Sequence, residues 1–192
     1  MSDGDFQAQI DRIEALLTSA ADRDYIGEGL SQLEHALQSA ALATRAGAPR
    51  DEVVAALLHD IGHRCDPSAE SSPVGVIEHD ELGANFLESL GFGPAVVELV
   101  RGHVRAKRYL VATRPDYSSR LSPASAESLR RQGGPLPEVE QDAFRANPWW
   151  EARVRLRSWD DAAKVPDLAV PPLSTYRAAI EEHLAAQKHA AE

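Results

Sequence analysis

The sequence predicts an all-α fold in one domain, residues 1–192, and three observations support this prediction. Apolar residues recur at spacings of three and four along most of the chain, as on one face of an amphipathic helix. Gly and Pro, which interrupt helices, stand between these segments. No run alternates apolar and polar residues as a half-buried strand does. We therefore expect a helical bundle.

The first two helices have clear sequence signals. Ile10 and Ile13 belong to a set of apolar residues at helical spacing, which predicts a helix over 6–19. A second helix is expected over 29–46, because Gly47 stops the periodic pattern.

The third helix is expected over 51–61, with Asp51 as its N-cap. A polar loop follows over 64–77, and Ser122 has the character of an N-cap for a helix over 122–132. The remaining helices are expected over 78–90, 94–109, 137–146, 148–164 and 174–188.

Composition limits the possible functions. The formal net charge of −10 argues against a nucleic-acid partner, because phosphate backbones bind clustered Lys and Arg. No run of about 18 apolar residues indicates a membrane span, and the acidic N-terminus has no apolar signal segment. The single cysteine, Cys65, forms no internal disulfide. We expect a soluble protein of the reducing cytoplasm.

Histidine placement is the most informative feature. Five histidines occur in or beside apolar helices, namely His35, His59, His63, His79 and His103. His183 and His189 lie on a polar C-terminal helix and are expected to be solvated. A buried His59–Asp60 step is costly unless its polar groups are satisfied, either in a polar core network or at a metal. Imidazole and carboxylate together suit Fe, Mn or Zn, and an aspartate can bridge two ions.

The order His35, then His59-Asp60, then a distant Asp160 resembles the H…HD…D signature of HD-domain metalloproteins. These are mostly helical and mostly phosphohydrolytic, and His79 and His103 match the subset that holds a second metal. The resemblance implies one ion on His35, His59, Asp60 and Asp160, and another on Asp60, His79 and His103. Asp60 would bridge the two ions. Asp160 is preferred to Asp161 because the family's aspartate lies four residues before a lysine, here Lys164.

A narrower resemblance covers almost the whole chain. The segments are "YIGEGLSQLEHALQ", "HDIGH", "VGVIEHDELGANFL", "HVRAKRYL" and "RSWDDAAK". Together they resemble the mixed-valent diiron oxygenases that cleave carbon–phosphorus bonds. The resemblance implies two iron ions, active as an Fe(II)/Fe(III) pair, with O2 as co-substrate. The implied substrate is a small 1-hydroxyphosphonate, first of all 2-amino-1-hydroxyethylphosphonate, cleaved to glycine and phosphate.

The same resemblance assigns further site residues. Tyr25 would be a displaceable iron ligand, Glu28 would bind the substrate amine, and His63 would hydrogen bond substrate or iron-bound oxygen. The phosphonate would be held by Lys107, Ser125, Ser128, Gln132 and Arg157. Helical spacing agrees, since His103 and Lys107 are four residues apart and so share a helix face.

Several alternatives remain open at this point. The substrate could be the N-trimethylated analogue, although a quaternary ammonium usually calls for an aromatic surface and only Tyr25 stands near Glu28. The chain could instead be an HD phosphohydrolase acting on a phosphoester, or a non-catalytic binding domain. Glu28 could merely cap the next helix, Tyr25 could pack in the core, and His63 could make a structural hydrogen bond.

Overall fold

The structure is a computed structural model that describes all residues except 1–2, 20–27, 66–67, 69–70, 73–74 and 192. The expected all-α fold is confirmed. The helices are α1 (Asp3–Thr18), α2 (Gln32–Arg45), α3 (Arg50–Leu58), α4 (Gly62–Cys65), α5 (His79–Ser89), α6 (Pro94–Thr113), α7 (Pro123–Arg131), α8 (Glu138–Ala146), α9 (Trp150–Ala162) and α10 (Arg177–Ala191). Two short 3₁₀ helices cover Ser118–Arg120 and Leu173–Tyr176.

The segment expected as a polar loop contains more structure than its composition indicated. It holds the last two residues of the short helix α4 and a two-stranded antiparallel ladder, β1 (Ser71–Ser72) with β2 (Gly75–Val76). Strands of two residues are too short to show an alternating pattern, so periodicity gave no signal for them.

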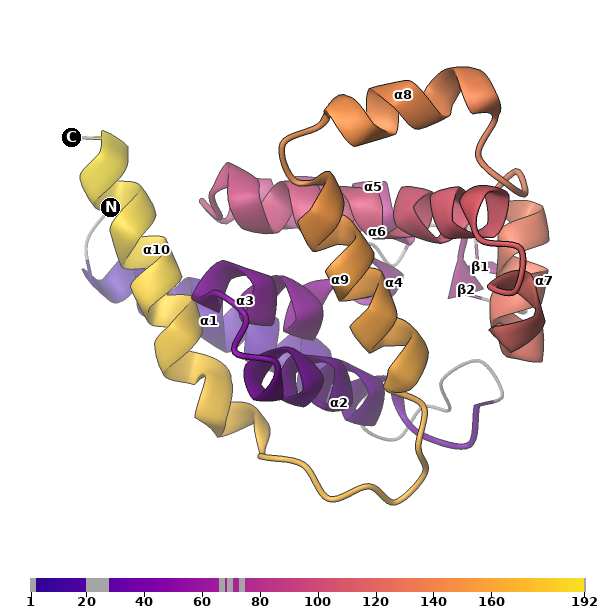
Figure 1. Ribbon diagram of the computed structural model, residues 1–192. Helices are drawn as coiled ribbons and strands as arrows, with labels where there is room; N and C mark the ends of the chain where they lie inside the picture. The colour runs from indigo at the N-terminus through magenta and orange to yellow at the C-terminus, as the bar shows by residue number, and fades with distance from the viewer. Residues whose placement is uncertain (1–2, 20–27, 66–67, 69–70, 73–74, 192) are drawn as a thin grey trace.

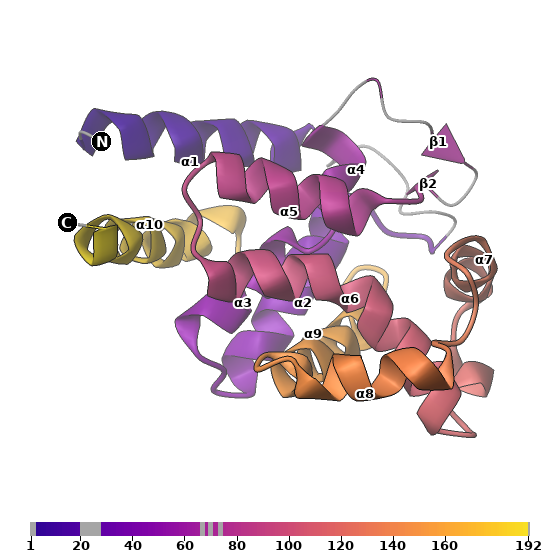
Figure 2. The ribbon, with the colours of Figure 1, turned by 90° about the horizontal axis from the view of Figure 1, so that it is seen from above.

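The helices pack around α3, which lies in the middle of the bundle. Contacts join α3 to α2, α6, α9 and α10, and α6 also packs against α5 and α9. In Figure 1, α9 crosses α2 and α6, while α7 lies at the edge of the molecule. Figure 2 shows α1 and α10, the first and last helices, on the same side of the bundle, and the two are in contact.

Helix α3 ends inside the protein because the hydrophobic core surrounds it. Every residue of α3 from Glu52 to Leu58 is buried, so this helix is covered on all faces. Leu57 and Leu58 join the main core with residues of the flanking helices, such as Leu99 and Leu156. His59 and Asp60, which directly follow α3, therefore lie in the interior.

Two residues that contact each other, Asp51 and His183, differ from expectation. Asp51 is not the N-cap of α3; Pro49 is, and Asp51 lies in the first turn. There it accepts a hydrogen bond from Nδ1 of His183 at 2.9 Å. The expectation that His183 is solvated was wrong: it is fully buried and also accepts the Gly93 N–H. The reason is that α10 packs against α3, which covers the face carrying His183. His189, near the end of α10, is exposed as expected.

The N-terminal caps of α7 and α2 are well defined. Ser122 caps α7 as predicted, accepting the Ser125 N–H at 3.1 Å. Ser31 and Glu34 form a capping box at the start of α2. Because this box fills the capping role, the alternative that Glu28 caps α2 is wrong.

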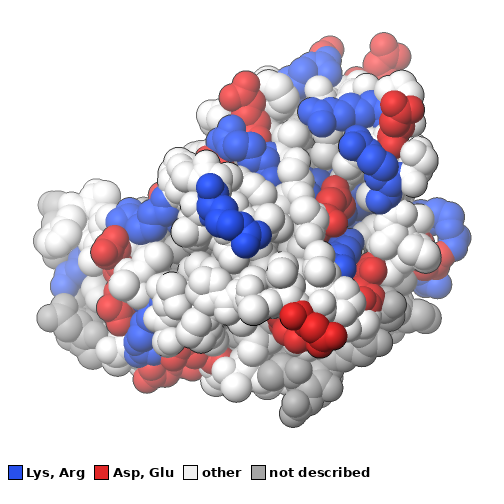
Figure 3. All heavy atoms as spheres, turned by 60° about the horizontal axis from the view of Figure 1, so that its bottom comes forward, with Lys and Arg blue, Asp and Glu red and all other residues white. Residues whose placement is uncertain are grey.

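The surface carries both signs of charge. On the face in Figure 3, Lys and Arg side chains are interspersed with Asp and Glu. Of the described helices, none combines the length and apolar character that a bilayer crossing requires.

Candidate active site

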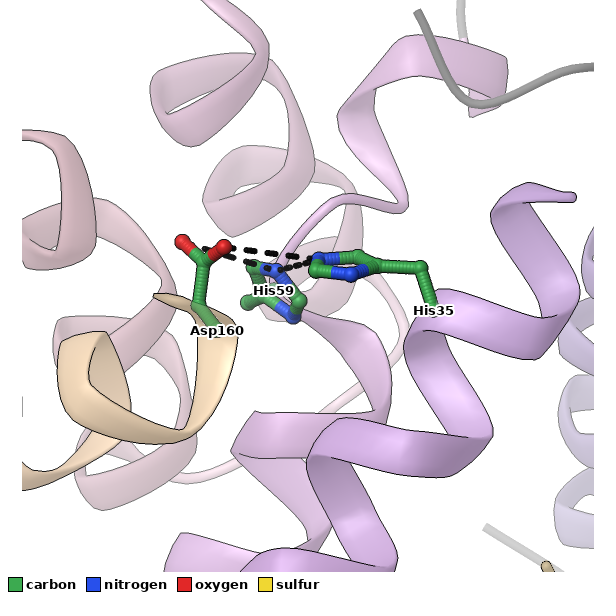
Figure 4. Close-up of side chains that lie close together, drawn as sticks. All are labelled: His35, His59 and Asp160. Atoms are coloured by element: carbon green, nitrogen blue, oxygen red, sulfur yellow. Dashed lines mark hydrogen bonds and ion pairs between the residues drawn. The ribbon is translucent and has the colours of Figure 1, made fainter. Parts of the chain in front are cut away.

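One cluster of potential metal ligands forms where α2, α3 and α9 meet. Nε2 of His35 lies 3.1 Å from Nε2 of His59 and 3.4 Å from Oδ1 of Asp160. Figure 4 shows the three side chains pointing toward one another from their separate helices. All three are buried.

A second cluster lies beside the first. It joins Asp60 to His79, at the start of α5, and to His103, on α6. The two imidazole Nε2 atoms are 3.0 Å apart. Oδ1 of Asp60 lies 3.4 Å from Nε2 of His79 and 3.5 Å from Nε2 of His103.

The Asp60 carboxylate lies between the two clusters. Its other oxygen, Oδ2, is 3.7 Å from Nε2 of His35 and 3.5 Å from Nε2 of His59. Each oxygen therefore faces one pair of histidines, which is the geometry that a bridging carboxylate requires.

Backbone carbonyls fix the tautomer of all four histidines. Nδ1 of each ring hydrogen bonds a main-chain oxygen: His35 to Ala163 at 2.8 Å, His59 to Ala56 at 2.9 Å, His79 to Val76 at 2.8 Å and His103 to Val100 at 2.7 Å. A carbonyl only accepts, so each Nδ1 carries a proton. In the neutral ring Nε2 then bears a lone pair, and the four lone pairs converge on the cluster.

This arrangement fits metal ions rather than a hydrogen-bonded core. Two Nε2 lone pairs facing each other at about 3 Å share no proton, and carboxylate oxygens surround them. Oδ1 of Asp160 is buried and has no hydrogen-bond partner among the described residues. Nδ1–H bonds to carbonyls are also the usual support of metal-bound histidines. The donor set fits two metal ions, one in each cluster.

Protonation states agree with metal binding. Burial lowers the pKa of His59 to about 4 despite the nearby Asp60 and Asp160 carboxylates, so the ring is neutral at pH 7. Burial acts to raise the pKa of Asp60, yet the surrounding histidines, His59 first, hold it well below its usual value. His103 differs: burial lowers its pKa, but the Asp60 carboxylate outweighs this and raises it.

A cavity opens onto the second cluster and gathers most of the predicted substrate-binding residues. Glu28, His63, Lys107, Ser125, Ser128 and Arg157 line it together with metal-ligand candidates. Gln132 is not among the described lining residues; it lies at the end of α7, with a buried Oε1 that has no partner in the described part of the chain. Tyr25 lies outside the described residues.

Two lysines reach the cavity side of α7. Nζ of Lys107 donates to Oγ of Ser128 and Nζ of Lys164 donates to Oγ of Ser125, each at 2.7 Å. Burial, helped by the charge of Arg157, lowers the pKa of Lys107 to about 7. The α7 serines and these two lysines therefore line the same cavity.

Arg157 is held rigidly beside the first cluster. Its guanidinium donates to Oδ2 of Asp160 at 2.6 Å, to the Tyr117 hydroxyl oxygen at 3.1 Å, and to Asp161. Asp161 is thus a partner of Arg157, while Asp160 faces the histidines. Sequence reasoning missed Tyr117, which lies in an irregular stretch without periodic signal, and Lys164, which served only to locate Asp160.

His63 has the opposite tautomer to the four clustered histidines. Its Nδ1 accepts the Val76 N–H at 3.1 Å, so in the neutral ring Nε2 carries the proton. Burial, together with the neighbouring His79, holds its pKa well below the usual value. The ring stacks on His79 with centroids 4.0 Å apart, and Gly75, at φ +82°, leaves room for it. His63 is therefore equipped to donate a hydrogen bond into the cavity.

The fold and the donor set define a class of helical metalloprotein, and comparison with known proteins gives its family. The chain belongs to the HD-domain family, which matches residues 33–146. That match includes five of the ligand candidates and ends before Asp160, which the structure brings to the same cluster.

Individual relatives extend the similarity beyond the HD match. The chain is 40% identical over 179 residues to hydroxymethylphosphonate dioxygenase of Gimesia maris, covering 91% of this chain and 89% of that one. It is 39% identical over 164 residues to [1-hydroxy-2-(trimethylamino)ethyl]phosphonate dioxygenase (glycine-betaine-forming) of Leisingera caerulea, covering 84% and 83%. An uncharacterized protein, L432, of Acanthamoeba polyphaga mimivirus is 35% identical over 164 residues, covering 84% and 75%. The predicted resemblance to phosphonate-cleaving HD oxygenases is confirmed.

Proposed function

We propose that this protein is a C–P bond-cleaving dioxygenase that converts a 1-hydroxyphosphonate and O2 into phosphate and a carboxylate. One observation carries the proposal: a single cavity is lined both by metal-ligand candidates, namely Asp60, His79, His103 and Asp160, and by cationic and hydroxyl groups. Two relatives named as phosphonate dioxygenases, at 39% and 40% identity, support it.

The metal ions we propose are iron. His35, His59, Asp60 and Asp160 would hold one, and Asp60, His79 and His103 the other. A bound iron pair supplies the one-electron O2 chemistry that amino-acid side chains lack. Tyr25 is proposed as a displaceable ligand in this scheme.

The chain itself binds and orients the substrate. Lys107 and Arg157 supply charge to the phosphonate dianion, and Ser125, Ser128 and Gln132 supply neutral hydrogen-bonding groups. Arg157 is pre-oriented by its three partners, which reduces the entropy lost when a phosphonate binds. The Nε2–H of His63, which lines the cavity, would donate a hydrogen bond to a substrate oxygen.

Among 1-hydroxyphosphonates we favour 2-amino-1-hydroxyethylphosphonate, cleaved to glycine and phosphate. Glu28 places a carboxylate in the cavity, and a carboxylate attracts a cationic group on the substrate. The trimethylated analogue is less favoured, because the described lining residues include no aromatic ring other than imidazoles.

Phosphorus NMR of the iron-loaded protein, with and without O2, tests the proposal. The substrates are hydroxymethylphosphonate, 2-amino-1-hydroxyethylphosphonate and its trimethylated analogue. We expect phosphate only when O2 is present, with glycine formed from the amino compound. The main rival, an HD phosphohydrolase, predicts phosphate from a phosphoester without O2 and with Mn²⁺ in place of iron. No phosphate from any of the three substrates under O2 would overturn the proposal.

We also propose that residues 1–192 act as one domain. The buried residues of α1 and α10 belong to the same hydrophobic cluster as α3 and α9, which supports a single cooperative unit.

A further inference from the structure

Lys164 occupies a position between two parts of the cavity. It lies just beyond the end of α9, and its side chain is only 11% exposed. Nζ donates to Oγ of Ser125, on the wall assigned to the phosphonate, and also lies 3.8 Å from Oε1 of Glu28. The Lys164 ammonium therefore lies next to both Ser125, proposed to bind the phosphonate, and Glu28, proposed to bind the amine.

Glu28 depends on this ammonium in the free protein. Its side chain is 13% exposed and accepts a hydrogen bond from the Ser122 hydroxyl. A carboxylate that is mostly removed from water is costly without a counter-ion, and more so beside a bound dianion. Lys164 is the cation that the structure places against it.

The charge of Lys164 also acts on the phosphonate side. Burial and Arg157 lower the pKa of Lys107, and Lys164 lowers it further. Both lysines donate to serines three residues apart on α7, so the two ammonium groups face the same wall. A small displacement away from Glu28 would add Lys164 to the groups that hold the phosphonate.

We propose that Lys164 is a specificity-determining residue that exchanges partners according to the substrate. With a substrate that has no cation, Lys164 remains the counter-ion of Glu28. With an ammonium-bearing substrate, the ammonium replaces Lys164 at Glu28 and Lys164 turns to the phosphonate. This inference rests on the proposed function and extends it, because it lets one cavity accept both kinds of 1-hydroxyphosphonate.

Turnover of two substrates by the iron-loaded enzyme tests the exchange. In Lys164→Gln, Glu28 lacks a counter-ion when hydroxymethylphosphonate binds, so kcat/KM for that substrate should fall about tenfold more than for 2-amino-1-hydroxyethylphosphonate. Glu28→Gln should show the reverse preference. The double variant should recover much of the hydroxymethylphosphonate activity lost in Lys164→Gln, because both members of the pair are then neutral. Lys164→Arg, which keeps the charge, should retain the wild-type preference.

Binding provides a readout that does not depend on turnover. Anaerobic calorimetry with methylphosphonate and 2-aminoethylphosphonate should show the same change of preference in Lys164→Gln. An equal loss for both ligands, or a double variant no better than Lys164→Gln, would overturn the inference. A preference that switches in calorimetry while no 1-hydroxyphosphonate is turned over would support the inference and overturn the proposed function. Circular dichroism and iron content establish that each variant is folded and loaded.

Discussion

At the scale of single residues, adjacent aspartates at the end of α9 have different tasks. Asp160 faces His35 and His59, whereas Asp161 binds Arg157 and Tyr117. We predict that Asp160→Asn lowers bound iron by about one ion per chain, because a neutral amide is a poor metal ligand. Asp161→Asn is the matched control and should keep its iron. Metal analysis by mass spectrometry measures both, and equal iron loss in the two variants would contradict the assignment.

The lowered pKa of Lys107 predicts how the affinity for a phosphonate depends on pH. Its pKa is lowered to about 7 by burial and by Arg157. A phosphonate dianion pairs with the protonated form of Lys107. Binding then takes up a proton on Lys107, so affinity should fall as pH rises above about 7, by up to about tenfold per pH unit.

Calorimetric titrations from about pH 6 to about pH 9 measure this dependence, with Lys107→Arg as the control. Arginine stays protonated throughout this range, so the fall in affinity above about pH 7 should be absent in Lys107→Arg. The same pH profile in the wild type and in Lys107→Arg would show that the Lys107 proton has no part in binding.

The burial of single residues could be predicted from the sequence where they belong to a recognisable motif. His59 and Asp60 follow an apolar helix, so their delivery to the interior could be predicted. Tyr117 could not, because its task is to orient Arg157 across a gap of 40 residues and no spacing rule encodes that contact. His183 was misjudged because a polar helix composition does not reveal which face α10 buries.

At the scale of elements, the second cluster depends on a close approach of α4 and α5. A Cβ at Gly62 would lie 1.8 Å from the carbonyl oxygen of His79, the first residue of α5. We predict that Gly62→Ala destabilises the protein by about 1–3 kcal/mol or more and lowers metal binding at His79, because backbone cannot give way as a side chain can. Thermal unfolding and metal content measure the two effects.

Gly93→Ala is the matched control for this prediction. The three atoms nearest to its new Cβ belong to the side chain of Gln187, which can move, and the backbone φ of Gly93, −76°, suits alanine. A loss as large as that of Gly62→Ala would mean that the separation of α4 and α5 is not the cause. The glycine in "HDIGH" could be read from the sequence as a helix end, but its contact with α5 required the structure.

At the scale of the whole molecule, the metal site joins elements from most of the chain. Its six ligand candidates come from α2, the end of α3, α5, α6 and α9. Any ion that binds only the folded state stabilises it, by about 2.7 kcal/mol when its concentration is 100-fold above Kd. Removing metal with a chelator should therefore lower the melting temperature by about 5–10 °C for a protein of this size. Asp160→Asn should show a smaller chelator effect, and an unchanged melting temperature in the wild type would contradict a bound metal pair.

The fold class could be predicted from the sequence because helical periodicity runs along most of the chain, whereas the ligand set came from the resemblance to HD-domain proteins. The arrangement of charge in the cavity could not be predicted. The chain carries a net charge of −10, yet Lys107, Arg157 and Lys164 gather at one pocket from distant segments. Such a local gathering of cations depends on tertiary packing, and total composition does not reveal it.

We infer that O2 itself supplies the oxygen atoms that C–P cleavage adds to the two products. Conversion of 2-amino-1-hydroxyethylphosphonate to glycine and phosphate adds one oxygen atom to each product. Turnover under ¹⁸O2 in unlabelled water, followed by mass spectrometry of both products, measures the source. We predict one labelled oxygen in glycine and one in phosphate. Products formed without any label from O2 would assign the oxygen to water and the protein to hydrolytic chemistry.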